Sequence, residues 1–138
     1  MSKVAVIFWS GTGNTEAMAN AVADGAKANG AEVDLLACAD VSDVSSYDAV
    51  ALGCPAMGAE ELEDGEFLPM LESVEGALPG KKVALFGSYG WGDGEWMRTW
   101  EARCGEKGIT LACESLIVNE APDDEGLEKC KALGAAIA

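Results

Sequence analysis

The stretch that decides the fold is VAVIFWSGTGNT at residues 4–15, where an unbroken apolar run passes directly into glycine, hydroxyl and amide residues. The run from Val4 to Trp9 is rich in β-forming residues, so we expect a strand buried on both faces. The alanine-rich segment from Asn14 to Asn29 predicts a helix, which Gly30 ends. A buried strand, a tight loop and a helix in this order are typical of the first unit of an α/β fold.

The same alternation continues to the end of the chain. Further strands are predicted at residues 33–37, 49–53 and 82–87, with an interrupted last strand within 110–118. Further helices are predicted in the second half of 60–76 and at 95–107 and 124–137. Since no linker or repeat separates these elements, we expect residues 1–138 to form one α/β domain, with a parallel sheet covered on both faces. Ligands of such sheets bind beyond the carboxyl ends of the strands, where the strand order reverses.

The chain is strongly acidic. Its 138 residues include 9 basic and 24 acidic side chains, for a formal charge of −15, while 49% are hydrophobic. The hydrophobic fraction supports a buried core and excludes a disordered acidic tail. A nucleic-acid binder, or a protein docked on an anionic membrane, would need clustered Lys and Arg, so we expect neither partner. No signal segment and no apolar run of roughly 20 residues is present, so we expect a cytoplasmic protein. We also expect a monomer.

The sequence contains no histidine, which excludes histidine acid–base catalysis, a Ser-His-Asp triad and most zinc or copper sites. Its five cysteines are widely spaced and form no CxxC pair, so we expect reduced, small core residues rather than a metal cluster or a disulfide framework. They are Cys38, Cys54, Cys104, Cys113 and Cys130.

The loop after the first strand has the composition of an anion site. Exposed N–H groups and the helix dipole at a helix N-terminus favour phosphate, and hydroxyl groups add donors. The loop has no lysine for a P-loop, and Glu16 stands where a dinucleotide fingerprint needs its third glycine. Without a cation the phosphate keeps its charge, so we expect it to anchor a cofactor rather than react. The predicted phosphate ligands are Ser10, Gly11, Thr12, Gly13, Asn14 and Thr15.

Two further loops follow buried strands at the same edge of the sheet. They are CPAMGAE at 54–60 and SYGWGDG at 88–94, and each offers one large side chain among small residues, Met57 or Trp91. Such a side chain either packs on the protein or stacks on a ligand that glycines allow to approach. Because three such loops meet at one switch point, stacking on a bound ligand is the favoured interpretation.

On four stretches the chain resembles the short-chain flavodoxins of anaerobic bacteria. These are WSGTGNTEAM at 9–18, LGCPAMGAEELED at 52–64, KKVALFGSYGWGDGEWM at 81–97 and IVNEAPD at 117–123. The resemblance implies a flavodoxin-like, doubly wound, five-stranded parallel sheet of order 2-1-3-4-5. It also implies one non-covalent FMN, cycling between semiquinone and hydroquinone in a low-potential one-electron carrier that is not itself an enzyme.

The resemblance also assigns roles in the second loop. Met57 is similar to the inner flank of the flavin ring, and Glu60 to the residue that receives flavin N3–H. The Gly58–Ala59 peptide is similar to one that flips on reduction, so that the Gly58 carbonyl accepts flavin N5–H. A type II′ turn needs φ > 0 at its second residue, which Gly58 supplies, while Ala59 stands where relatives often have Asp or Gly. The residues expected to contact the cofactor here are Pro55, Ala56, Met57, Gly58, Ala59 and Glu60.

In the third loop, Trp91 resembles the outer flank of the ring, and the backbone from Ser88 to Gly92 would line the pyrimidine and ribityl side. The cofactor residues implied there are Ser88, Tyr89, Gly90, Trp91 and Gly92. Asn119 is similar to a ribityl contact.

Charge would tune the bound flavin. The bond to the Gly58 carbonyl favours the neutral semiquinone, whereas the phosphate and nearby carboxylates repel the anionic hydroquinone. Two unit charges about 10 Å apart at an effective dielectric constant of about 20 interact by roughly 1.7 kcal/mol. Between residues 28 and 80 there are twelve Asp or Glu and no Lys or Arg. This face is either simply solvated or steers transient redox partners with basic docking surfaces, in a salt-sensitive manner.

Three alternatives remain on sequence grounds. An FMN-dependent reductase would take hydride from a nicotinamide cofactor, although the three loops lack basic residues for a 2′-phosphate. A specialised flavodoxin-like activator of a manganese ribonucleotide reductase would be separated by its neighbouring genes. A non-redox binding domain would stay colourless with added FMN.

Overall fold

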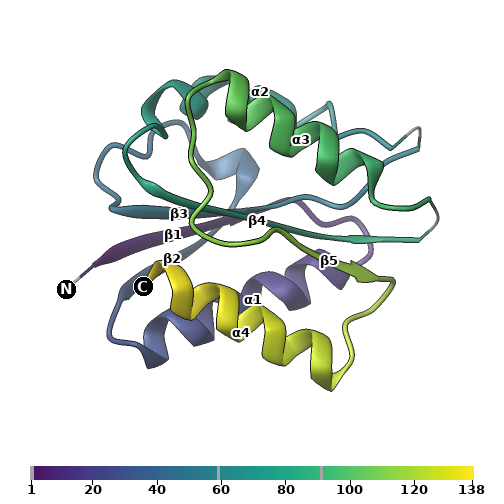
Figure 1. Cartoon of the computed structure of the whole chain (residues 1–138), viewed down its shortest axis with the longest axis horizontal. Coiled ribbons are helices and arrows are strands. Elements are labelled where there is room, and N and C mark those ends of the chain that lie inside the picture. The colour runs from purple at the N-terminus through teal and green to yellow at the C-terminus, as the bar shows by residue number, and fades with distance from the viewer. Residues whose placement is uncertain (1, 59, 91) are drawn as a thin grey trace.

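The computed structural model describes residues 2–58, 60–90 and 92–138, and these form a five-stranded parallel sheet in the order β2-β1-β3-β4-β5 (Figure 1). The strands are β1 (Lys3–Phe8), β2 (Glu32–Ala37), β3 (Ala49–Gly53), β4 (Lys82–Tyr89) and β5 (Leu116–Asn119). The helices are α1 (Asn14–Ala28), α2 (Phe67–Val74), α3 (Glu95–Glu106) and α4 (Asp124–Ile137), with short 3-10 turns η1 (Cys38–Asp40) and η2 (Glu75–Ala77). The predicted strand order is confirmed.

One face of the sheet carries α1 and α4, as Figure 1 shows. These helices approach closely because glycine lies at their contact. A Cβ on Gly25 would lie 2.0 Å from the carbonyl oxygen of Lys131, and one on Gly134 would lie 2.0 Å from that of Val22. Any larger residue at either position would push the helices apart.

The opposite face carries α2 and α3 and packs with aromatic side chains. Trp96, Trp100 and Cys104 lie on one face of α3 and are all buried, as the helical spacing predicts. Trp100 meets Phe67 of α2 edge to face, with ring centroids 5.4 Å apart. These contacts fix α3, which follows the third loop, against the helix that follows the second.

Two predicted boundaries are wrong in detail. β1 ends at Phe8, although Trp9 N–H still donates to the Gly53 carbonyl at 3.0 Å. Helix α2, by contrast, begins at Phe67, in the predicted second half of 60–76, after a tight turn around the Glu63 carboxylate. The last strand is only Leu116–Asn119, and the interruption expected before it is present.

The five cysteines are unpaired, and Cys38, Cys54, Cys104 and Cys130 are buried, as their irregular spacing predicts. None of the helices in the described part of the chain has the length and apolar character needed to cross a membrane.

Candidate cofactor site

The three predicted loops meet around one cavity at the carboxyl ends of the strands. Its volume is about 620 Å³, within the range usual for sites that bind small molecules. The lining residues are Trp9, Gly11, Thr12, Asn14, Pro55, Ala56, Met57, Ser88, Tyr89, Gly90, Glu120 and Ala121. Among the remaining predicted residues, Ser10, Gly13, Thr15, Gly58, Glu60, Gly92 and Asn119 lie beside this lining in sequence without forming it. Ala59 and Trp91 lie outside the described residues.

The first loop leaves the start of α1 open to an anion. Gly13 is the N-cap residue, with φ 96°, and it has no side chain to cap the helix. Its N–H donates instead to the Ser10 hydroxyl oxygen at 3.0 Å, which leaves the Ser10 hydroxyl hydrogen able to donate elsewhere. The N–H groups of the first helical turn have no carbonyl partner within the helix. Together with the helix dipole, they favour the binding of a phosphate.

Two predicted ligands hold the first and third loops together. Thr15, 1% exposed, and Ser88, 4% exposed, place their hydroxyl oxygens 3.2 Å apart across the sheet edge. Each hydroxyl satisfies part of the other's hydrogen-bonding capacity, so neither is a fully solvated donor. Ser88 still lines the cavity, whereas Thr15 lies behind it.

The second loop is a tight hairpin. Met57 N–H donates to the Glu61 carbonyl at 2.9 Å, and Glu61 N–H returns a bond to the Met57 carbonyl at 3.2 Å. The expected positive φ at Gly58 is not seen in this structure, where Glu60 instead takes φ 53°. A three-residue connection usually places its left-handed residue third, which explains why the conformation falls on Glu60.

Glu60 carries a buried acceptor without a donor. Its Oε1 atom is buried and has no hydrogen-bond partner among the described residues. A Cβ on Gly92 would lie 2.5 Å from that oxygen, and Gly92 has φ 88°, so this position requires glycine. An unpaired buried carboxylate oxygen is costly and fits a ligand that brings an N–H group. The flavin ring, which carries such a group at N3, therefore fits the residues present.

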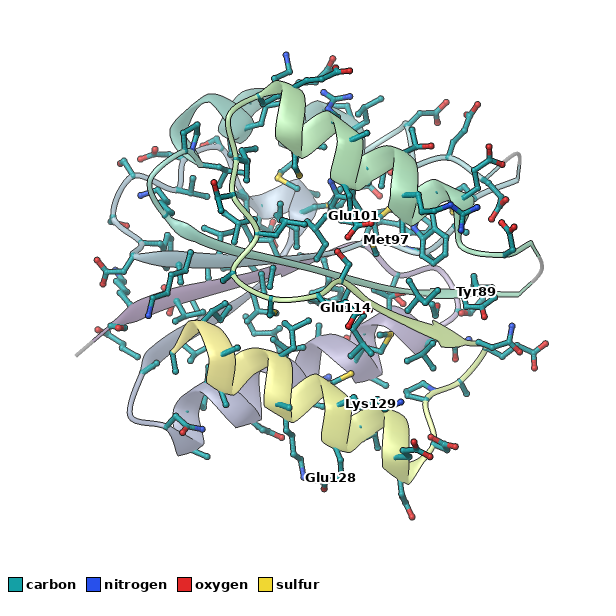
Figure 2. All side chains as sticks on the ribbon, viewed as in Figure 1. Tyr89, Met97, Glu101, Glu114, Glu128 and Lys129 are labelled. Atoms are coloured by element: carbon teal, nitrogen blue, oxygen red, sulfur yellow. The ribbon has the colours of Figure 1, made fainter. Side chains whose placement is uncertain are left out.

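The third loop is joined to the end of β5 at the Tyr89 carbonyl. This oxygen accepts from Glu120 N–H at 2.7 Å and from Asn119 Nδ2 at 3.2 Å. Figure 2 shows Tyr89 beside the end of β5. Glu120 takes φ 57°, which is uncommon for a residue with a side chain. The side-chain amide of Asn119 is thus engaged by backbone, while the next two residues reach the cavity.

Sequence reasoning missed three lining residues, Trp9, Glu120 and Ala121. All three lie inside the stretches that carry the family resemblance, each one or two positions from a predicted ligand. Their position next to predicted ligands was therefore the sequence signal that could have identified these three lining residues.

Cys54, the first residue of the second loop, is buried and packs in the core. Burial is the main cause that raises the pKa of its thiol to about 12. Its sulfur accepts Glu63 N–H at 3.4 Å, and its carbonyl accepts the Trp96 indole N–H at 3.1 Å. A thiol with so high a pKa is not a nucleophile at neutral pH.

A cavity at the switch point of a 2-1-3-4-5 sheet, beside an open helix N-terminus, defines a doubly wound protein that binds a phosphorylated cofactor. The family model described as flavodoxin matches residues 6–134. The flavodoxin of Megasphaera elsdenii is 51% identical, covering 98% of both chains, and that of Clostridium beijerinckii is 45% identical, covering 96% of this chain and 97% of its own. The chain belongs to the flavodoxin family.

Solved structures agree with this assignment. The two-electron reduced Megasphaera elsdenii flavodoxin superposes with a TM-score of 0.87 at 47% identity, covering 97% of both chains. A flavodoxin from the domain Archaea gives a TM-score of 0.83 at 30% identity, covering 99% of this chain and 96% of its own. Flavodoxins are FMN-binding electron carriers rather than enzymes, so the predicted cofactor and the predicted class of function are confirmed.

Proposed function

We propose that this flavodoxin is a low-potential one-electron carrier that holds FMN non-covalently in the cavity formed by the three loops. The observation that carries the proposal is the unpartnered Glu60 Oε1 atom, buried against Gly92 of the third loop, in a structure whose loop cavity also contains residues of the uncapped start of α1. Bound FMN supplies the one-electron chemistry. The chain supplies binding, orientation and an electrostatic environment.

The phosphate end of the cofactor belongs at the start of α1. The backbone from Gly11 to Thr15 presents N–H groups there, and the hydroxyls of Ser10 and Thr12 add donors. Thr12 and Asn14 line the cavity directly. Neutral donors hold a phosphate without cancelling its charge.

The ring end belongs between the second and third loops. Met57 would form one flank, with Pro55 and Ala56 beside it in the lining. Glu60 would accept the N3–H group of the ring. The Gly58 carbonyl would accept N5–H, and a Cβ at Gly58 would meet no described residue within 4 Å. Trp91 would form the outer flank.

The low potential follows from the charges that face the cofactor. No lysine or arginine is among the described residues that line the cavity, whereas Glu120 is. The nearest arginine in sequence, Arg98, is bound to Asp93 at 2.9 Å. A second electron on the cofactor would therefore meet phosphate and carboxylate charge with no lysine or arginine among the described residues of the lining.

The acidic surface around the second loop fits redox partners with basic docking surfaces. Glu61, Asp64 and Glu66 are exposed around the second loop. Uncompensated acidic charge next to a redox centre raises the association rate of cationic partners and makes it salt-dependent. We place this carrier in the cytoplasm as a monomer, and its unpaired cysteines fit a reducing compartment.

Stepwise reduction tests the proposal. The protein is titrated with FMN and then reduced with dithionite while visible spectra and potentials are recorded. We expect one-to-one binding and two separate midpoint potentials, the second well below that of free FMN. A single two-electron reduction would contradict the one-electron function, and consumption of NADH or NADPH by the holoprotein would then support a reductase.

A further inference from the structure

Trp9 joins the phosphate loop to a distant segment of the chain. Its backbone N–H donates to the Gly53 carbonyl at 3.0 Å, and its indole Nε1–H donates to Glu66 Oε1 at 3.0 Å. Glu66 lies 57 positions later, directly before α2. The indole is therefore fixed at two points, one on the sheet and one beyond the second loop.

The indole also packs against the phosphate loop. A Cβ on Gly11 would lie 3.0 Å from the Trp9 Cη2 atom, so the ring lies directly against the Gly11 backbone. Trp9 lines the cavity together with Gly11 and Thr12. Any rotation of the indole would change the space available to this part of the loop.

The backbone of the residue that holds the indole is itself held. Glu66 N–H donates to Glu63 Oε1 at 2.7 Å, and that carboxylate also accepts N–H groups from Gly65 at 2.7 Å and Phe67 at 2.8 Å. Glu63 N–H in turn donates to the Cys54 sulfur at 3.4 Å. The anchor for Trp9 is therefore an exposed carboxylate on a turn whose backbone N–H groups are satisfied.

We propose that Trp9 is a positioning residue for the phosphate of the cofactor. Held by Glu66, its indole fixes the backbone at Gly11, and with it the direction of the N–H groups that face the phosphate. The inference rests on the proposed function and deepens it, since it adds a residue that selects phosphorylated flavin over riboflavin. Preorganised donors bind an anion more tightly because less ordering remains to be done on binding.

A different role for Trp9 would leave a different signature. If the indole only lined the cavity, its alteration would weaken FMN and riboflavin equally, since both contain the same ring and ribityl chain. If it positions the phosphate donors, only FMN is affected. The ratio of the two dissociation constants separates these roles.

The experiment measures FMN and riboflavin dissociation constants by quenching of flavin fluorescence. Trp9→Phe keeps a ring but removes the indole donor, and Glu66→Ala removes the acceptor. We expect each to weaken FMN binding by about three- to tenfold, because the lost bond acts on the phosphate donors only through the loop backbone, and to leave riboflavin binding unchanged. Glu66→Gln keeps an acceptor oxygen and should restore most of the selectivity. Asp64→Asn removes a neighbouring exposed carboxylate and serves as the control.

An equal loss for both ligands, or no loss for FMN, would overturn the inference. Both Glu66 variants leave Trp9 in place, so the test does not depend on one altered core residue. Wild-type protein that bound no FMN would refute the proposed function instead, and the two failures are therefore distinguishable.

Discussion

The amino and carboxyl ends of the strands differ in how their polar groups are satisfied. At the amino end, the Tyr47 hydroxyl donates to Asp34 at 2.6 Å, and Lys3 N–H donates to Asp48 at 2.9 Å. At the carboxyl end, Glu60 Oε1 is buried without a partner among the described residues. These polar groups of the amino end are satisfied within the chain, whereas Glu60 Oε1 at the carboxyl end is left for a ligand.

Backbone strain follows the same division. Among the described residues, the two with a side chain and positive φ are Glu60, at 53°, and Glu120, at 57°. Both lie at the carboxyl end, one in the hairpin after β3 and one directly after β5. Strained backbone persists where function requires it, and both of these residues lie at one edge of the sheet, although a second unpartnered buried atom, Trp100 Nε1, lies within α3.

A negative charge in the phosphate loop should produce the largest effect. Thr12→Asp would place a carboxylate against the phosphate, and we expect FMN affinity to fall more than about hundredfold, roughly 3 kcal/mol. The same carboxylate at a helix N-terminus should leave the apoprotein as stable as before, or stabilise it. Binding titrations and urea unfolding of the apoprotein measure the two effects. Loss of stability together with affinity would contradict an anion site.

Removing the Glu63 carboxylate should destabilise the turn before α2. Burial acts to raise the pKa of Glu63, but three backbone N–H donors outweigh it and lower the pKa from its usual 4.5. Glu63→Gln would set an amide donor against one of these N–H groups, and we expect a loss of about 2 kcal/mol at neutral pH.

The pH dependence checks the cause of that loss. Because the folded pKa is lowered, the carboxylate's contribution is complete above about 4.5 and is lost as the pH falls through the folded value. Urea unfolding of both proteins should therefore show the difference shrinking in acid. A difference that stays constant down to pH 3 would exclude the charged hydrogen bonds as its source.

At the amino end, Tyr47→Phe should lower stability by about 1 kcal/mol and leave FMN affinity unchanged. The hydrogen bond to Asp34, with burial and nearby acidic charge, raises the pKa of Tyr47 to about 12. Its contribution is therefore present below the usual value of 10 and is lost as the pH rises toward about 12. Unfolding measured between pH 8 and 11 should show the stabilities of the wild type and the variant converging. A change in FMN affinity would contradict the claim that the amino end takes no part in cofactor binding.

The smallest effect is expected at Glu120. Its left-handed backbone costs about 1 kcal/mol with a side chain, while glycine costs a similar amount in chain entropy. Glu120→Gly should therefore change stability by less than about 0.5 kcal/mol. Glu128, which projects from α4 in Figure 2, is the matched control, since Glu128→Gly should cost about 1 kcal/mol. Equal losses in thermal unfolding would show that Glu120 is unstrained.

Local patterns predict the sheet but not the contacts that complete the site. The apolar runs at 49–53 and 82–87 become β3 and most of β4, because buried parallel strands must be apolar throughout. The first two loops follow directly from where β1 and β3 end. The bond from Trp9 to Glu66 joins positions far apart in sequence, so no local pattern contains it. Residue preferences alone would have assigned the left-handed backbone conformation to Gly58. It falls on Glu60 because Met57 pairs with Glu61.

The most direct test of the central claim, that the carboxyl end of the sheet holds the cofactor, is a high-resolution crystal structure of the protein with FMN. The account predicts the phosphate among the N–H groups at the start of α1 and a ring N–H group on the Glu60 carboxylate. FMN bound elsewhere, such as the cavity of about 460 Å³ between β5 and α4, would contradict it. So would a complex in which Glu60 Oε1 still faced no donor.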